Sequence, residues 1–449
     1  MTASPANPGP TLVGRRPPLG AGRRLAPAAP VSRALLVVLV AMAIPSTASI
    51  QAGPLRLSPY RIVMLFAFVP MLLLFASRRF GRFLAADFLV LFYASWAWLS
   101  LTVHHGPEVS LESGGIYFLE SVGAYLFGRC LIRDSDQFGR ALRYCWLGLC
   151  LLLPFVLLEC LTGKHLIQSV FAALQGRSFS SAIDTRAGFH RAFGPLDHPI
   201  LWGVVSAAFI APVWYYSAGP GDRVTVRRIG RTLVPFLCAV TSLSSGAVTV
   251  SLVQIGLIAW ERATRRIRGR WWILTGGIVL LYIFIDMLSN RSGIRVFLSY
   301  LTFSPGTAYN RLIIWEWGFH HNAMEHPLFG IGMNDWVRPS WMHSGSMDNF
   351  WLVVAVTFGL PASIALITAF VLSIRGLGRR AASADPRRLG LAFSMIAIGL
   401  AGATVHFWNG SFVFVMFMLG CAAAVGASPA GAVPRRPAPS RLVLREAHP

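Results

Sequence analysis

The sequence predicts an all-α integral membrane protein with about twelve transmembrane helices. The chain has 449 residues, of which 55% are apolar and only 13% are charged, and its mean hydropathy is +0.58. A soluble domain carries about 25% charged residues. This composition therefore excludes a soluble globular enzyme and a disordered scaffold. We expect no nucleic-acid partner despite the formal net charge of +22.

Twelve apolar runs are long enough, or nearly long enough, to cross a bilayer, which takes about 20 residues per helix. Several of them are short. The runs lie at 34–50, 62–76, 84–103, 115–128, 144–162, 199–218, 232–244, 247–260, 271–289, 349–373, 389–405 and 411–427.

The arginines orient these spans. Lys and Arg favour cytoplasmic connections, and alternate connections contain 30 of the 40 basic residues but only six of the 18 acidic ones. These connections are 1–33, 77–83, 129–143, 219–231, 261–270, 375–388 and 428–449. The pattern predicts a membrane domain over 34–427 between two disordered basic tails, 1–33 and 428–449, with both termini in the cytoplasm.

Residues 232–260 must cross the membrane twice with only about 14 residues per arm, fewer than a usual span. The turn lies at Ser244-Ser245-Gly246. Either this turn lies inside the membrane or the arms are half-helices, and such backbone persists only beside protein or a wet cavity.

Two outer connections, 163–198 and 290–347, are long and contain Arg and His on the side where Arg is scarce. In the first, Pro199 suits the first turn of a helix, and the N–H groups of that turn would form an anion site beside Arg191 and His198. In the alternative interpretation, the arginines pair with Asp184 and Asp197 and only hold the loop.

The second outer loop predicts a helix from Thr307 to Asn322, with Arg311 and Trp315 on one face. His326-Pro327 ends it. The His spacing fits no zinc pattern, so we predict no metal. Asp348 begins the span 349–373, where a carboxylate serves as a plain helix cap or as a functional group.

Four charged residues lie within spans: Asp87, Glu120, Glu159 and Asp286. Ionisable residues in a membrane are functional candidates by default. Glu120 is the most central, and the other three lie close enough to span ends to be solvated.

Four motifs in order, over about residues 185–375, resemble those of the O-antigen ligase and polymerase superfamily. They are Arg191-Ala-Phe-Gly194 with His198-Pro199, Ser242-Leu-Ser244-Ser-Gly246, Asn310-Arg311-Leu-Ile-Ile-Trp315 with His326-Pro-Leu-Phe-Gly330-Ile-Gly332, and Asp348-Asn349 followed by Gly359-Leu-Pro. The turn arginine of the family is Ser245 here, and the ligase His before Asn is Asp348. These departures weigh against a strict lipopolysaccharide-core ligase. The stretch Ser346-Met-Asp-Asn-Phe-Trp-Leu352 is more similar to the exopolysaccharide repeat-unit polymerases of the superfamily.

The resemblance implies a GT-C-like, metal-independent membrane glycosyltransferase of the bacterial inner membrane, with its two long loops in the periplasm and no cofactor. Its substrate would be an oligosaccharide repeat on polyprenyl diphosphate, and the product an exopolysaccharide or O-antigen. Membrane lipid, a chain-length regulator and the flippase of the same pathway are the implied partners.

The chemistry of such a transfer selects residues in the outer loops. The guanidinium group of Arg neutralises a diphosphate through paired N–H donors. We therefore expect Arg191 and Arg311 to bind the diphosphate, assisted by Arg291 and Arg295. A hydroxyl acceptor needs a base, and Asp348 is our first choice and His343 our second. His198, His326 and Trp315 complete the expected substrate-binding set, and Trp315 could instead anchor the interface.

Two other functions remain open at this point. A ligase would move a finished glycan to a lipid or protein acceptor by the same chemistry. A flippase or transporter of lipid-linked sugars would carry its charges along a central cavity between repeated halves. The concentration of Arg and His in two outer loops favours the enzyme.

Overall fold

The computed structural model describes residues 32–53, 55–78, 80–181, 185–288, 305–381 and 385–428. Its N-terminal half comprises α1 (Arg33–Ala43), β1 (Ile50–Ala52), β2 (Leu55–Leu57), α2 (Pro59–Ala76), α3 (Ala85–Phe118), the π-turn η1 (Leu119–Gly123), α4 (Ala124–Leu131), α5 (Ser135–Thr162) and α6 (Leu166–Ala173). The predicted tails fall almost wholly outside the described residues.

The rest of the chain is also helical. It comprises α7 (Pro199–Ala207), α8 (Ile210–Tyr216), the short turn η2 (Pro220–Asp222), α9 (Val226–Val240), α10 (Ser245–Ala263), α11 (Arg270–Leu288), α13 (Pro305–Gly318), the π-turn η3 (Phe319–Ala323), α14 (Phe350–Phe358), α15 (Leu360–Ala381), α16 (Arg387–Ala401) and α17 (Asn409–Ala427).

Seven helical segments among the described residues are long and apolar enough to cross a membrane. They are Pro59–Ala76, Ala85–Leu131, Ser135–Thr162, Pro199–Tyr216, Arg270–Leu288, Leu360–Gly378 and Asn409–Ala427. The prediction of an all-α membrane protein is therefore confirmed. The number of twelve spans and the GT-C-like architecture stay predictions.

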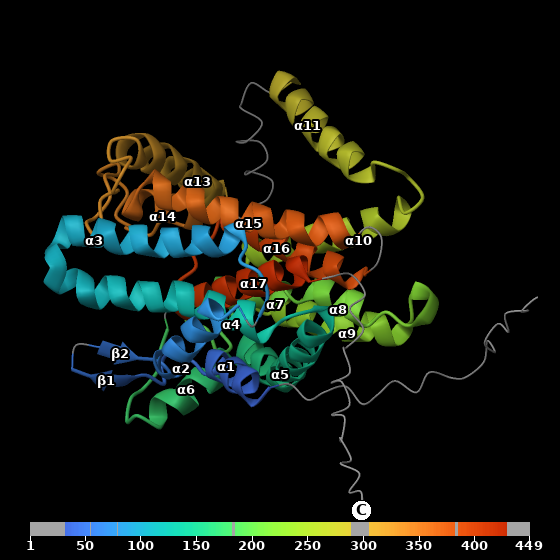
Figure 1. Ribbon diagram of the computed structural model, residues 1–449, viewed down its shortest axis with the longest axis horizontal. Coiled ribbons are helices and arrows are strands. Elements are labelled where there is room, and N and C mark those ends of the chain that lie inside the picture. The colour runs from blue at the N-terminus through green and yellow to red at the C-terminus, as the bar shows by residue number, and fades with distance from the viewer. Residues whose placement is uncertain are drawn as a thin grey trace, which may run out of the picture.

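The segment Ala85–Leu131 doubles back on itself. Its 47 residues would extend about 70 Å as one helix, more than twice the thickness of a bilayer core. The chain instead reverses at Gly106, where φ is 77° and ψ is 168°, so Figure 1 shows two antiparallel arms. The two predicted spans 84–103 and 115–128 lie in these arms.

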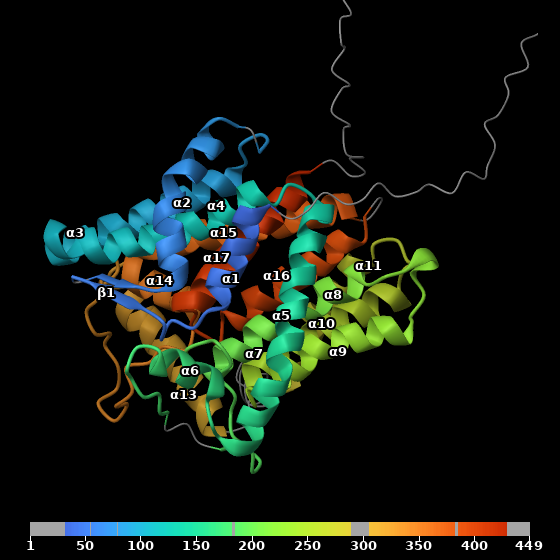
Figure 2. The ribbon, with the colours of Figure 1, turned by 90° about the horizontal axis from the view of Figure 1, so that it is seen from below.

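Helix α17 runs through the middle of the bundle (Figures 1 and 2), and 94% of its apolar window is buried. Its backbone meets that of α4 directly. A Cβ atom added to Gly420 would lie 2.1 Å from the Tyr125 carbonyl oxygen, and one added to Gly128 would lie 2.1 Å from the Phe417 oxygen. Small residues at a crossing permit such close packing in membrane helices.

The connections predicted to be cytoplasmic contact one another at one end of the bundle. Arg387 pairs with Asp136 at 2.5 Å, and an Arg129 Nη atom donates to the Arg82 carbonyl at 2.8 Å. In Figure 1 the connection between α10 and α11 lies at the right, and the reversal of α3 and the hairpin β1–β2 lie at the left.

The opposite end gathers the connections predicted to be outside. Asp197, before α7, accepts hydrogen bonds from Ser46 and from Asn409 Nδ2, the latter at 3.0 Å. The Met333 amide donates to His105 Nε2 at 2.8 Å. These contacts join predicted outer connections to one another, and the sidedness of the connections stays a prediction.

The predicted span 34–50 differs from the structure. Helix α1 ends at Ala43, and the chain then forms the hairpin β1–β2, with Ile50 paired to Leu57. Pro45 follows the last turn of α1 closely, and Pro cannot continue a helix. Arg56 on the hairpin donates to Ser49 Oγ at 2.8 Å.

The predicted span 349–373 is broken at Gly359, where φ is 90°. Contacts with the loop that follows α13 cause this break. The amides of Ile331 and Gly332 donate to the carbonyls of Val356 and Thr357 at 2.8 and 2.9 Å. A Cβ atom at Gly359 would lie 2.0 Å from the Leu328 oxygen. The loop that follows α13 thus ends α14, and α15 begins as a new helix.

Candidate active site

The turn between α9 and α10 forms one wall of the site. Ser242 and Ser244 are buried in this turn, in agreement with the prediction of a turn beside protein. Its carbonyl groups point toward the loop before α7. The Ser242 oxygen accepts from Arg191 Nε and the Leu243 oxygen accepts from Arg186 Nη1, both at 3.1 Å. Neutral backbone acceptors therefore orient these two guanidinium groups.

A tight turn presents Arg186. The Arg186 and Phe189 backbones pair in an isolated bridge, with hydrogen bonds of 2.9 and 3.0 Å. Ala187 and Gly188 between them have φ values of 51° and 80°. Arg191 is fixed two residues beyond the bridge, because the Ala192 amide donates to the Thr241 carbonyl at 3.0 Å.

Glu159 on α5 holds the Arg191-Ala-Phe-Gly194 motif in place. Its carboxylate accepts from the amides of Phe193 and Gly194 at 2.9 and 3.3 Å, and it bonds to His165 Nδ1 at 2.6 Å. Gly194 has a φ of 55°, and a Cβ atom there would lie 2.8 Å from the Trp202 ring. The charge on Glu159 is therefore used to position the loop.

His198 caps helix α7. Its Nδ1 atom accepts from the Ile200 amide at 3.2 Å, so the neutral ring carries its proton on Nε2. Burial, together with the cations Arg191 and Arg186, lowers the pKa of His198 from 6.5 to about 4, against the opposing effect of Asp348. His198 is therefore a neutral donor at pH 7.

Arg311 reaches the site from α13. Ile313 and Ile314 belong to a small cluster with Leu352 of α14, and this cluster fixes the helix. Within the part of the chain that the structure describes, the buried Arg311 Nε atom has no hydrogen-bond acceptor. Burial, helped by the cation Arg186, lowers the pKa of Arg311, while Asp348 raises it. A buried N–H without an acceptor favours binding of an anion.

Asp348 does not cap α14. Asn349 does, because its side chain accepts from the Leu352 amide at 3.0 Å. The interpretation of Asp348 as a plain cap is therefore wrong. Asp348 Oδ1 accepts from Ser346 Oγ at 3.0 Å, and the carboxylate is left half-buried next to the cap.

Electrostatic interactions link several of these residues. The Asp348 charge acts on His198, Arg311 and His406. The Arg186 charge acts on His198 and Arg311. Sequence reasoning missed His406 and did not select Arg186. The sequence feature that could have led to both residues is their position as charged or polar side chains in connections between spans.

The other predicted site residues are less well connected. His343, His326 and Trp315 are exposed, and among the described contacts none joins their side chains to Arg191, Arg311 or Asp348. Trp315 packs edge-on against Phe319 and does not share the half-buried environment of Arg311. Arg291 and Arg295 lie outside the described residues, so their roles stay predictions.

The alternative interpretation of the first loop fails for Asp197. This carboxylate is engaged with Ser46 and Asn409, and so it does not hold the loop by pairing with an arginine. Asp184 lies outside the described residues.

Two charged residues within spans form ion pairs elsewhere. Asp87 pairs with Arg129 at 2.9 Å at the end rich in arginine. Glu120, the most central charge, pairs with Arg61 at 2.7 Å. Neither pair includes a residue of the site. Among the described residues, no group of three His, Cys, Asp or Glu is placed to hold a metal ion.

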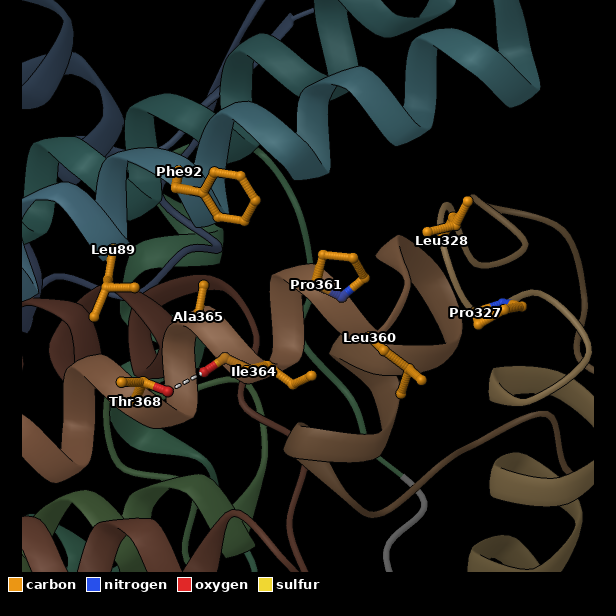
Figure 3. Close-up of a pocket in the computed structure, with 9 residues that line it drawn as sticks. All are labelled: Leu89, Phe92, Pro327, Leu328, Leu360, Pro361, Ile364, Ala365 and Thr368. Atoms are coloured by element: carbon orange, nitrogen blue, oxygen red, sulfur yellow. Dashed lines mark hydrogen bonds between the residues drawn. The ribbon is translucent and has the colours of Figure 1, made fainter.

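A groove of about 480 Å³ lies between α3 and α15, closed by Pro327 and Leu328 (Figure 3). Its lining is apolar apart from Thr368, whose hydroxyl donates to the Ile364 carbonyl at 2.7 Å. None of the site residues lines it. The groove therefore offers hydrocarbon contact and no polar chemistry.

One family model matches part of the chain. Residues 232–367 match the family described as O-antigen ligase, a stretch that includes the α9–α10 turn, Arg311 and Asp348. This match supports the O-antigen ligase/polymerase superfamily of membrane proteins, which the motifs predicted. None of the curated proteins matches the chain. The family supports a ligase or polymerase type of function that acts on lipid-linked oligosaccharide.

Acid should destabilise the protein through His198. A pKa lowered from 6.5 to about 4 means that the unfolded state binds more protons between these values. Stability is therefore complete above pH 6.5 and falls toward pH 4, at most by about 1.4 kcal/mol per pH unit for this group. His198→Asn keeps a good cap but cannot protonate. We expect its unfolding temperature in detergent to fall less steeply on acidification, and equal slopes would contradict the assignment.

Proposed function

We propose that this protein polymerises polyprenyl-diphosphate-linked oligosaccharide repeats into an exopolysaccharide or O-antigen on the periplasmic face of the inner membrane. One observation carries the proposal. Arg311 Nε is buried without an acceptor among the described residues, and the charges of Asp348 and Arg186 both act on Arg311. The charges of Asp348, Arg186 and Arg191 also act on His198.

The residues fit the transfer reaction. The oxygen of an acceptor sugar hydroxyl forms a bond to the anomeric carbon of the donor glycan, and the bond from that carbon to the diphosphate oxygen breaks. Asp348 takes the hydroxyl proton. The leaving diphosphate gains negative charge, which the planar forks of Arg191 and Arg311 stabilise through paired N–H donors.

The arginines take the place that a metal ion has in many phosphate sites, so we propose metal-independent transfer. The donor lipid remains in the membrane while its diphosphate lies at the surface. We expect a flippase to deliver the repeat and a chain-length regulator to act on the growing polymer.

The size of the stalled glycan tests the function. In cells lacking this protein, we expect lipid-linked single repeats to accumulate on the outer face, measured by mass spectrometry of extracted lipids. Restoring the wild-type chain should return long polymer. Long lipid-linked polymer in the deletion strain would identify a ligase, and single repeats trapped on the cytoplasmic face would identify a transporter. Either result would refute the polymerase.

A further inference from the structure

The connection between α16 and α17 adds aromatic and imidazole groups to the site. Residues 405–408 form neither a helix nor a strand, and buried and half-buried residues alternate along them. Val405 and Phe407 are buried in the core, at 3% and 2% exposure. His406 and Trp408 are both half-buried.

Backbone hydrogen bonds hold this segment against the start of α14. The Phe350 amide donates to the carbonyls of Gly402 and Val405 at 2.7 and 3.1 Å. The Phe407 ring lies 5.3 Å from the Phe350 ring. His406 follows Val405 directly, so its position is fixed beside the Asp348 segment.

Trp408 lies close to two imidazoles. Its ring centroid is 5.9 Å from that of His198 and 5.6 Å from that of His406, with interplanar angles of 58° and 52°. At these angles neither imidazole stacks flat on the indole. The Asp348 charge acts on both histidines. An aromatic ring, Trp408, is therefore next to both histidines on which the Asp348 charge acts.

We propose that Trp408, next to His198 and His406, is the subsite that holds the acceptor sugar ring and directs its hydroxyl to Asp348. This inference rests on the proposed function. Indole rings offer a flat apolar surface with a polar N–H, which suits the C–H face of a sugar. Neutral imidazoles supply one donor and one acceptor each for hydroxyl groups.

The histidines are suited to this role because they stay neutral. Burial lowers the pKa of His406 to about 4, against a smaller opposing effect of Asp348. Neither imidazole adds a positive charge that would draw the diphosphate away from the arginines. Trp408 is thus a binding residue, and Asp348 alone accepts the proton.

Direct binding of sugars tests the subsite. We would record saturation-transfer NMR of methyl glycosides of glucose, galactose, N-acetylglucosamine and rhamnose with the full chain in detergent. We expect signal with the wild type and with Asp348→Asn, and its loss with Trp408→Leu. Trp272→Leu is the matched control, because Trp272 on α11 is 82% exposed. Equal signal for Trp408→Leu and the wild type would overturn the subsite, and so would no signal for any wild-type sample.

Kinetics separate this inference from the proposed function. With lipid-linked repeat extracted from deletion cells, Trp408→Leu should raise the acceptor KM about tenfold, the loss expected for one aromatic contact, and lower kcat little. Trp408→Phe should lie between. A fall in kcat alone, or no change while Asp348→Asn is inactive, would overturn the subsite and leave the polymerase intact. Activity in Asp348→Asn would instead count against the proposed mechanism.

Discussion

We expect Arg311→Ala to lower the rate of chain extension by about 10³-fold, the usual loss when a cation that stabilises a leaving phosphate is removed. The buried Nε atom, without an acceptor among the described residues, marks Arg311 as a donor for a ligand. Arg311→Lys keeps the positive charge but loses the paired N–H donors of the planar guanidinium group. Its rate should therefore lie between those of Arg311→Ala and the wild type. The measurement is the length of the polymer and the amount of lipid-linked single repeat in cells.

Arg338→Ala is the matched control for Arg311. Arg338 belongs to the same outer loop and pairs with the exposed Asp335, an interaction that contributes little to stability. We expect wild-type polymer from this variant at an equal protein level. Wild-type polymer from Arg311→Ala would remove Arg311 from the mechanism.

Asp348→Asn should reduce transfer by about 10²- to 10⁴-fold, the range of general-base catalysis. The folded state should be unaffected, because Asn349 and not Asp348 caps α14. The measurement is the initial rate with purified protein and lipid-linked repeat, together with the unfolding temperature in detergent.

For Asn349, the neighbour of Asp348, we expect the opposite: a loss of stability with little loss of transfer rate. Asn349→Ala removes the cap and should cost about 1 kcal/mol of stability, while the transfer rate at a permissive temperature stays within a few-fold of the wild type. If Asn349→Ala were the inactive variant and Asp348→Asn the active one, the assignment of base and cap would be reversed.

Hydropathy and charge predicted much of the fold. The reversal near Gly106 and the helix α13 are at the predicted places, because each follows from local residue patterns. The buried turn at 241–244 begins three residues before the predicted Ser244-Ser245-Gly246, because Ser245 and Gly246 already belong to α10. The break at Gly359 could not be predicted in this way. It depends on amides of Ile331 and Gly332 that approach from a distant loop.

The site was predicted in part. Electrostatic interactions link His198 to Arg191 and Asp348, and Arg311 to Asp348, all of which the motifs had selected, but their roles stay predictions. His406 and Trp408 were missed because they lie outside those motifs, in a short turn whose proximity to α14 is set by hydrogen bonds to Phe350. The role of Asp348 was also ambiguous, because two adjacent residues, Asp348 and Asn349, could each cap a helix.

The small cluster between α13 and α14 has a consequence for how activity is lost. Arg186 and Arg191 are held by a turn inside the main bundle, whereas Arg311 is held by Ile313 and Ile314 in a separate hydrophobic cluster. Peripheral units of this kind can open at a lower free energy than the whole protein. Mild heating would then separate α13, with Arg311, from the rest of the bundle. Activity would be lost while most of the helical content remained.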